Sequence, residues 1–348
     1  MAPPTPIKTG IVGVGSSALT FHVPMLLALS NHYVVHSVFE RKATQDAKKT
    51  GVLDRSRAAA GHYHNSQRNA LSFCKSCPRG KKNVLLEKPS QGVVLSAFQN
   101  RRWDSDFLTV KKLINEGKLG DITEFESHFD RYRPSPRTTA FWREAAGPGA
   151  GHTFDLGPHL IDQVLQLFGR PNRLTGFIQN LRGFGGPAVD DTFLIHFHYD
   201  RKPYPIRATV AASSLSVKKS QLRFSVRGSK GSFEKKGLDP QEDQLKAGKP
   251  TPLDPQFGRE VEGIFGTLDT VTEDGSIQTE KVVSEKGAYS LLFENLADAI
   301  TSSTEPQVKF EQSAAVIQMI ELAMLSSREA RTVEVPQLEA CAYKTRVR

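Results

Sequence analysis

Residues 8–24, KTGIVGVGSSALTFHVP, decide the fold at the start of this chain. Lys8–Gly15 is typical of a short buried strand that enters a glycine turn. Ser16–Leu29 then has the apolar spacing of a helix, and Tyr33–Phe39 follows as a second strand that ends at Glu40. This order of strand, glycine turn, helix, strand and acidic residue predicts the opening of a Rossmann βαβ unit.

The glycine turn, Gly13-Val-Gly15-Ser-Ser-Ala18, fits the dinucleotide-binding pattern G-x-G-x-x-A. Gly13 permits the tight turn, Gly15 lets the backbone approach a pyrophosphate, and Ala18 permits close packing of helix on strand. The N-terminus of the next helix favours an anion. This turn, including Ser16 and Ser17, is therefore the candidate cofactor site, and the alternative is an ordinary glycine turn.

The second strand ends in Glu40-Arg41-Lys42, which bears on the kind of cofactor. Glu40 could accept hydrogen bonds from ribose hydroxyls, which favours NAD, whereas Arg41 and Lys42 could hold the 2′-phosphate of NADP. A solvated turn is the alternative for all three residues. NAD and NADP therefore both stay open.

A third motif, Glu87-Lys88-Pro89, directly follows the apolar run 83–86. A lysine at the end of a buried strand is partly desolvated, which lowers its pKa toward the range that suits general acid–base chemistry. Lys88 is therefore a candidate catalytic residue. The alternative is a surface lysine after a strand, with Pro89 stiffening the turn in either case.

The fourth motif, Asp155-Leu-Gly-Pro-His159, opens a helix predicted over 157–168. Asp155 and His159 are four residues apart and lie on one helix face, which Asp162 and Gln166 extend as a polar stripe. Such a stripe on an apolar helix can line a cleft. The alternative makes Asp155 an N-cap and His159 a satisfied, half-buried histidine.

The remaining pattern predicts mostly antiparallel strands covered by helices. Further helices are expected at 104–116, 288–302 and 311–330, and strands at 122–132, 173–181, 191–199, 205–213 and 221–227. Two further short strands are expected at 83–86 and 93–98. Only Ser90, Gln91 and Gly92 separate them after Pro89, whereas a parallel crossover needs about a dozen residues.

Composition limits the function classes. The chain has 348 residues, 38% of them hydrophobic, which suffices for two domains. It contains no apolar run of the ~18 residues that a membrane span requires and no secretory signal pattern. Three cysteines argue against a disulfide framework and favour the cytoplasm. Cys74 and Cys77 lack the second ligand pair of a zinc site, so no metal is expected.

The formal charge of +9 does not indicate nucleic-acid binding, because the basic excess is local. Between Arg55 and Lys82 there are seven basic residues and no acidic residue. The same region, residues 54–81, has neither helical nor strand periodicity. A Rossmann domain needs two further strands here, so the predicted Rossmann domain is incomplete.

Together these motifs resemble the Gfo/Idh/MocA family of NAD(P)-dependent sugar and polyol oxidoreductases, over residues 7–52 and 83–335. Residues 13–24 resemble a branch with the pattern G-x-G-x-x-x-x-x-F-H-x-P, and Glu87-Lys88-Pro89 is similar to the most specific signature of the family. Segments 98–107, 128–131, 155–162 and 237–242 look closest to scyllo-inositol dehydrogenase-like enzymes.

The resemblance implies an α/β fold with a Rossmann domain at 1–118 and an α/β domain at 119–335, followed by a tail at 336–348. The face of the open, mostly antiparallel sheet of the second domain would serve the active site and often a homodimer. The expected substrate is a cyclic polyol or sugar. By resemblance Lys88, Asp155 and His159 match the catalytic residues of the family. The candidate cofactor-binding residues are Gly13, Gly15, Ser16, Ser17, Ala18, Glu40, Arg41 and Glu87. Asn100 and Arg102 follow the strand at 93–98 and could reach substrate hydroxyls, and the alternative for both is a structural role in the turn between the domains.

One departure from the family has a simple explanation. The family carries a segment like T-P-N-x-x-H that this chain lacks. Back-translation of residues 65–80 with a shift of one nucleotide permits Ile-Pro-Asn-Ala-Thr-His-Phe-Pro-Phe-Ala-Lys-Ala-Ala-Leu-Glu-Ala, which is very close to that segment. Our hypothesis is that residues 54–81 come from a wrong frame or a misplaced splice and that a helix is missing after Pro89.

Three classes of function follow. The first is an oxidoreductase that transfers hydride between nicotinamide and a polyol hydroxyl. The second is a non-catalytic protein of the same fold that senses NAD(P), against which intact Lys88, Asp155 and His159 argue. The third is a defective product, because a Rossmann sheet without two strands exposes edges and loses burial.

Overall fold

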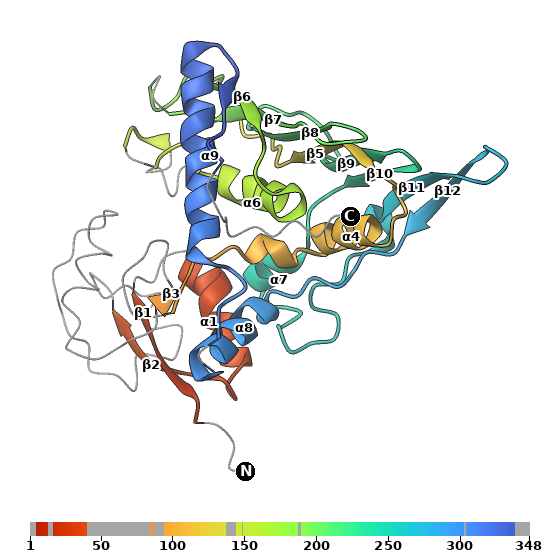
Figure 1. Ribbon diagram of the computed structural model, residues 1–348. Helices are drawn as coiled ribbons and strands as arrows, with labels where there is room; N and C mark the ends of the chain where they lie inside the picture. Colours follow the sequence, from red (N-terminus) through yellow and green to blue (C-terminus); the bar gives the residue numbers. More distant parts are fainter. Residues whose placement is uncertain are drawn as a thin grey trace. The chain divides into compact units, whose positions relative to one another are not determined.

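The computed structural model describes residues 5–12, 17–39, 84–85, 94–136, 144–147, 149–186, 189–302 and 304–337. The chain divides into two compact units. The first unit comprises residues 1–104, 239–259 and 286–310, and the second comprises 105–238, 260–285 and 311–348. Figure 1 shows the course of the chain through both units. The predicted irregular region at 54–81 lies outside the described residues.

The first unit begins with the predicted strand, helix and strand. β1 (Ile7–Val12) pairs in parallel with β2 (Tyr33–Phe39), and the register runs from Ile7↔Tyr33 to Val12↔Phe39. Between them lie a π-helical turn, η1 (Ala18–His22), and α1 (Val23–Ala28). Parallel neighbours joined through a helix are the βαβ arrangement that the opening residues predict.

The next described elements of the first unit are two short strands. β3 (Val84–Leu85) and β4 (Leu95–Ser96) are parallel, with Val84 opposite Leu95. Residues 86–94 alone connect them, which is fewer than the roughly dozen residues that a parallel crossover normally requires. The strand positions agree with the prediction, and the connection is as short as the sequence indicates.

The core of the first unit joins chain segments that are far apart in sequence. Met25 of α1 and Tyr33 of β2 pack in one buried cluster with Trp103, Tyr289 and Phe293. η3 (Asn100–Trp103) carries Trp103, and α8 (Ser290–Ser302) carries Phe293 and directly follows Tyr289. α7 (Gln241–Ala247) adds Leu245 to the same cluster. The division therefore differs from the single boundary predicted after residue 118, because the chain returns twice to the first unit.

The second unit is built on one nine-stranded sheet with the order β12-β11-β10-β9-β5-β8-β7-β6-β13. Only the β5–β8 pair is parallel, so the predicted, mostly antiparallel sheet is confirmed. The strands are β5 (Ile122–His128), β6 (Arg173–Gln179), β7 (Thr192–Tyr199), β8 (Ile206–Ser213), β9 (Leu222–Gly228), β10 (Gly231–Lys236), β11 (Gly266–Val271), β12 (Ile277–Val282) and β13 (Val333–Glu334).

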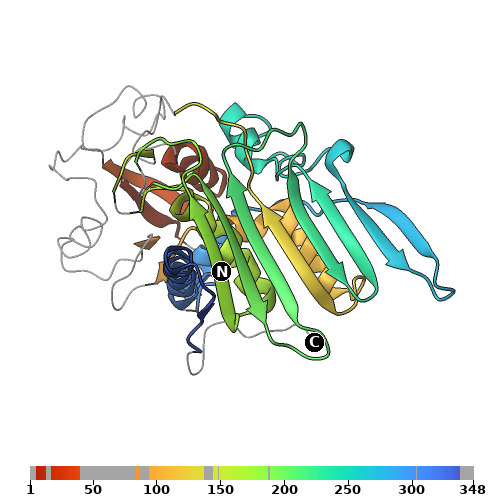
Figure 2. The same cartoon turned by 90° about the horizontal axis from the view of Figure 1, so that it is seen from above.

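Helices cover one face of this sheet. Figure 2 shows α4 (Ser105–Asn115) and α6 (Gly157–Phe168) behind the strands, and α9 (Phe310–Glu329) packs beside them. Burial alternates strictly along β7, because every second residue faces the helices. Phe125, Phe168 and Phe224 meet in the resulting core. α4 buries Phe107 and Val110 there, which is why it belongs to the second unit.

Candidate active site

The candidate residues Asp155 and His159 lie at the junction of two helices in the second unit. A short helix, α5 (His152–Asp155), ends at Asp155, and α6 begins at Gly157 with Pro158 in its first turn. Leu156, with φ −108°, joins the two helices. The N-cap positions are Gly151 and Leu156, so the alternative that made Asp155 an N-cap is wrong.

Helix α6 has the predicted two faces. Leu160 and Val164 are fully buried in the sheet-side core, whereas Asp155 and His159 are half-buried. Asp162, the next residue of the polar stripe, is 1% exposed. The stripe is therefore partly accessible at Asp155 and His159, buried at Asp162, and half-buried again at Gln166.

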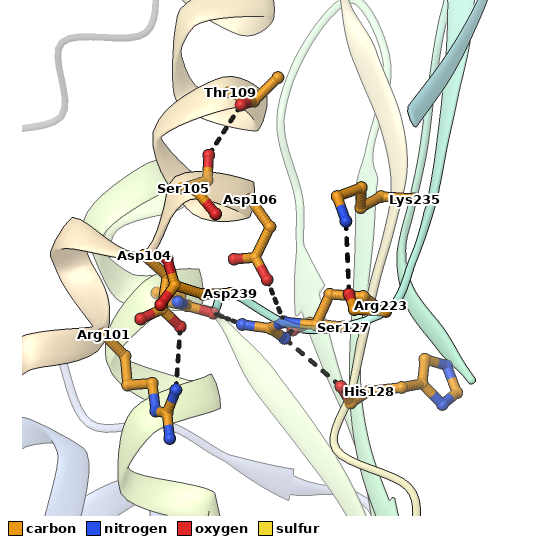
Figure 3. A network of polar contacts seen from close by, with 12 residues as sticks. Arg101, Asp104, Ser105, Asp106, Thr109, Ser127, His128, Arg223, Lys235 and Asp239 are labelled. Atoms are coloured by element: carbon orange, nitrogen blue, oxygen red, sulfur yellow. Dashed lines mark hydrogen bonds and ion pairs between the residues drawn. The ribbon is translucent and has the colours of Figure 1, made fainter. Parts of the chain in front are cut away.

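A buried arginine is the centre of the polar contacts next to α6 (Figure 3). Arg223 of β9 is fully buried, and its Nε donates to Asp106 Oδ2 at 3.1 Å. Its Nη1 donates to Ser127 Oγ at 2.7 Å, and its Nη2 donates to Gln163 Oε1 at 3.0 Å. The guanidinium also lies 4.1 Å from the centroid of the Phe224 ring. A buried guanidinium is costly unless its N–H donors have acceptors, so the contacts of Arg223 favour this one arrangement of its neighbours.

Most predicted cofactor residues lie outside the described residues: Gly13, Gly15, Ser16, Glu40, Arg41 and Glu87, together with the candidate base Lys88 and the pair Cys74 and Cys77. Ser17 and Ala18 are described. Ala18 is buried at the start of the helical segment, as close packing of helix on strand requires. The parallel strands around that segment also fit a dinucleotide site.

The predicted substrate residues Asn100 and Arg102 lie in η3 and are buried within the first unit. Arg102 Nη1 donates to the carbonyl of Gln307 at 3.0 Å, which ties η3 to the segment that precedes α9. This contact favours the structural role that the sequence had left open for Arg102. For Asn100, the structure establishes burial alone.

The motif at 237–242 has a structural role in the first unit. Gln241 Nε2 donates to the carbonyl of Trp103 at 3.1 Å, and Gln241 Oε1 accepts from the Tyr289 N–H at 2.8 Å. Arg101 forms ion pairs with Asp104 and Glu242. Burial raises the pKa of the Tyr289 hydroxyl, which donates to Asp104 at 2.7 Å. These contacts join the three chain segments of the first unit.

Replacing Glu242 with glutamine should make the first unit less stable in a pH-dependent way. Burial alone would raise the pKa of the Glu242 carboxyl, but Arg101 and Lys246 lower it from 4.5 to about 2. The Glu242 carboxyl therefore binds a proton less tightly in the folded state than in the unfolded state. The stabilisation is fully present above pH 4.5 and is lost as pH falls toward 2.

We expect Glu242→Gln to lower the free energy of unfolding by about 2 kcal/mol at pH 7. The difference in this free energy between the variant and the original chain should become smaller below pH 4.5. Urea titrations of both proteins at several pH values measure this. Glu305→Gln, which changes an exposed carboxylate on the same unit, is the matched control and should show no such trend. A difference in the free energy of unfolding that stays constant down to pH 3 would contradict the lowered pKa of the Glu242 carboxyl.

Two general features of the described residues complete the site. No described helix combines the length and apolar character of a membrane span. Within the same described ranges, no three His, Cys, Asp or Glu side chains gather as metal ligands would.

The two compact units and the nine-stranded, mostly antiparallel sheet define a class: a two-part α/β protein. Residues 111–335 match the C-terminal alpha/beta domain of the Gfo/Idh/MocA oxidoreductase family. The chain therefore belongs to this family, as its motifs predict.

Several known proteins are similar along nearly the whole chain. An uncharacterized oxidoreductase of Schizosaccharomyces pombe is 32% identical over 375 positions, which cover 95% of this chain and 100% of the relative. scyllo-Inositol 2-dehydrogenase (NADP(+)) IolW of Bacillus subtilis is 32% identical over 360 positions, covering 94% and 95%. The crystal structure of an oxidoreductase from Bacillus cereus matches with a TM-score of 0.81 at 27% identity, covering 95% and 100%.

Proposed function

We propose that this chain is an NAD(P)-dependent dehydrogenase that oxidises a secondary hydroxyl of a cyclic polyol or sugar, or reduces the corresponding ketone. The observation that carries the proposal is the half-buried Asp155–His159 pair at the α5–α6 junction, in a unit that matches the family. The buried Ala18 and the parallel β1–β2 pair support a dinucleotide site in the first unit.

The chemistry divides between cofactor and protein. Nicotinamide supplies the hydride acceptor or donor when it is bound. Lys88 and His159 take the proton from the reacting hydroxyl or return it, and Asp155 orients His159. Gly13, Gly15 and Ala18 would hold the pyrophosphate, and Glu40 or Arg41 would contact the ribose or its 2′-phosphate.

The similarity to scyllo-inositol 2-dehydrogenase (NADP(+)) supports an inositol-like substrate. A ring that carries several hydroxyls suits a site with both a proton-transfer pair and further polar side chains. Asn100 is the remaining candidate for contact with a substrate hydroxyl.

A screen of the purified protein against inositols and aldoses, with NAD and NADP in parallel, tests the proposal. We expect the 340 nm absorbance of the reduced cofactor to rise with at least one polyol and one cofactor. Omission of the polyol and the His159→Gln variant are the controls. Fluorescence titration with NADH and NADPH then separates binding from turnover. No turnover in either direction with any polyol, aldose or corresponding ketone, despite cofactor binding, would favour the non-catalytic sensor.

A second proposal concerns the integrity of the chain. The alignment with the yeast relative spans 375 positions, whereas this chain has 348 residues. The relative must therefore carry segments that have no counterpart here. Together with the short β3–β4 connection, this supports the hypothesis that residues 54–81 are translated in a shifted frame and that a helix is missing after Pro89.

Sequencing of the cDNA tests that hypothesis directly. We expect a transcript whose corrected frame encodes Pro-Asn-Ala-Thr-His before the Glu87-Lys88-Pro89 motif. A transcript that encodes the present residues 54–81, together with peptides from this region detected by mass spectrometry, would refute it. The corrected protein should then be used in the activity screen beside the present one.

A further inference from the structure

Asp190 and Arg223 each hydrogen-bond to the segment that carries Asp155 and His159 and so attach it to the rest of the second unit. We propose that Asp190 and Arg223 are positioning residues that hold Asp155 and His159 in their reactive arrangement. The proposal rests on the function proposed above, and it adds two residues that no sequence motif singled out.

The first attachment is at the start of α5. Gly151 occupies the N-cap position and has no side chain to cap the helix. Asp190 supplies the cap from a separate loop: its Oδ2 accepts from the Thr153 N–H at 2.7 Å and from Thr153 Oγ1 at 2.8 Å. The Asp190 carbonyl accepts from the His152 N–H at 3.0 Å. The bonds from the His152 and Thr153 N–H groups satisfy two backbone donors that a helix N-terminus otherwise leaves free, and the Thr153 hydroxyl adds a side-chain bond to the same carboxylate.

The backbone connects the capped first turn of α5 to Asp155. The Asp155 N–H donates to the Gly151 carbonyl at 3.1 Å, so Asp155 stands one helical hydrogen bond from the capped turn. Gly151 has φ +91°, and a Cβ there would collide with the Asp190 carboxylate. His152 also contacts Ser214 Oγ through Nε2 at 2.8 Å. A shift of Asp190 would therefore move the turn that sets the place of Asp155.

The second attachment is one turn beyond His159. Gln163 lies four residues after His159, on the same side of α6, and accepts from Arg223 Nη2 at 3.0 Å. Arg223 cannot follow a moving helix, because Asp106 and Ser127 hold its other nitrogens and Phe224 lies against its guanidinium. The contact therefore fixes the rotation of α6 about its own axis, and with it the direction of His159.

Apolar packing alone would not fix the rotation of α6 about its own axis. Leu160 and Val164 fix how deeply α6 sits in the core, but side chains of this kind allow small rotations of a helix. A misplacement of about 1 Å at a catalytic group can cost about 100-fold in rate. Directional hydrogen bonds on either side of Asp155 and His159 are the means by which the fold limits that error.

The test compares Asp190→Asn and Arg223→Lys with two matched controls in the full chain. Asp200→Asn and Arg227→Lys make the same chemical changes at exposed positions of the second unit. For each protein we would measure kcat, KM, the Kd of reduced cofactor and the melting temperature. Histidine labelled at Cε1 gives NMR titration curves for the ten histidines, and loss of one signal in His159→Gln identifies His159.

We expect kcat to fall about 10- to 100-fold in Asp190→Asn and Arg223→Lys at a temperature where both are folded. The Kd of the cofactor should change less than about 2-fold, because the dinucleotide residues lie in the first unit, and the His159 titration should move. The controls should match the original chain. Reduced melting temperature with unchanged kcat and an unchanged His159 titration would overturn the proposal.

The two proposals can fail separately. If the original chain has no turnover, the proposed function fails, yet the NMR titrations still decide whether Asp190 and Arg223 set the environment of His159. A His159 signal that moves in both variants and stays in both controls supports positioning. A signal that is the same in all five proteins overturns it.

Discussion

Replacement of Lys88 with alanine is expected to lower kcat by about 10²- to 10⁴-fold while the Kd of NAD(P)H stays nearly unchanged. The reason is that the proposed reaction must move a proton together with the hydride, and we propose Lys88 as a group that transfers this proton. In the proposal, the pyrophosphate and ribose contacts would come from other residues of the first unit. Steady-state kinetics with the substrate found in the screen, and fluorescence titration of the cofactor, measure the two quantities.

Lys112→Ala is the control for this prediction. Lys112 is an exposed lysine on α4 that forms an ion pair with Glu285 at 2.6 Å, so its loss should leave kcat within about 2-fold. Equal activity of Lys88→Ala and the original chain would remove Lys88 from the mechanism. A loss of cofactor binding in Lys88→Ala would instead place its ammonium at the cofactor phosphates or ribose.

The helix with the candidate site was predictable because its signals are local. Residues 157–168 combine helical apolar spacing, a proline in the first turn and Gly169 after the last turn, and the structure has α6 with these bounds. β7 was predictable for the same kind of reason, since its alternation of buried and half-buried residues is present in the residue types.

The elements at the far edge of the sheet were missed. β12, Ile277–Val282, contains Gln, Thr, Glu and Lys, and five of its six residues are exposed. β10 ends in Glu234-Lys235-Lys236, which is typical of a solvated turn. Lys235 is nevertheless fully buried, because its Nζ pairs with Glu260 at 3.1 Å. A partner that is 25 residues away in sequence leaves no periodic signal.

The same limit explains why the two returns of the chain to the first unit, at residues 239–259 and 286–310, were not predicted. Asp239 and Gln241 fix residues of the first unit, but the motif that contains them is indistinguishable in sequence from a turn with a helix start. Arg223 on β9 likewise has the pattern of an exposed strand residue. Its burial depends on Asp106, which is 117 residues earlier in the chain. Local patterns predict elements, and only the folded chain establishes which distant charges meet.

Replacement of Asp106 with alanine is expected to lower the free energy of unfolding of the second unit by about 3 kcal/mol. Asp106 and Arg223 both have fully buried side chains, and the variant leaves the guanidinium in the core without its carboxylate partner. Urea unfolding followed by far-UV circular dichroism, with the transition of each unit fitted separately, measures the loss. Asp106→Asn should lose less, because an amide oxygen can still accept from Arg223 Nε.

Glu124→Ala provides the contrast, because Glu124 pairs with Arg227 at 3.0 Å on the solvent side of the sheet. An exposed pair contributes about 0–1 kcal/mol, and salt should weaken it further. The loss in Asp106→Ala should instead persist at high ionic strength, since water and ions do not reach a buried pair. Equal losses in both variants would mean that Arg223 finds other acceptors at little cost, and the rigid attachment of α6 would then lose its physical basis.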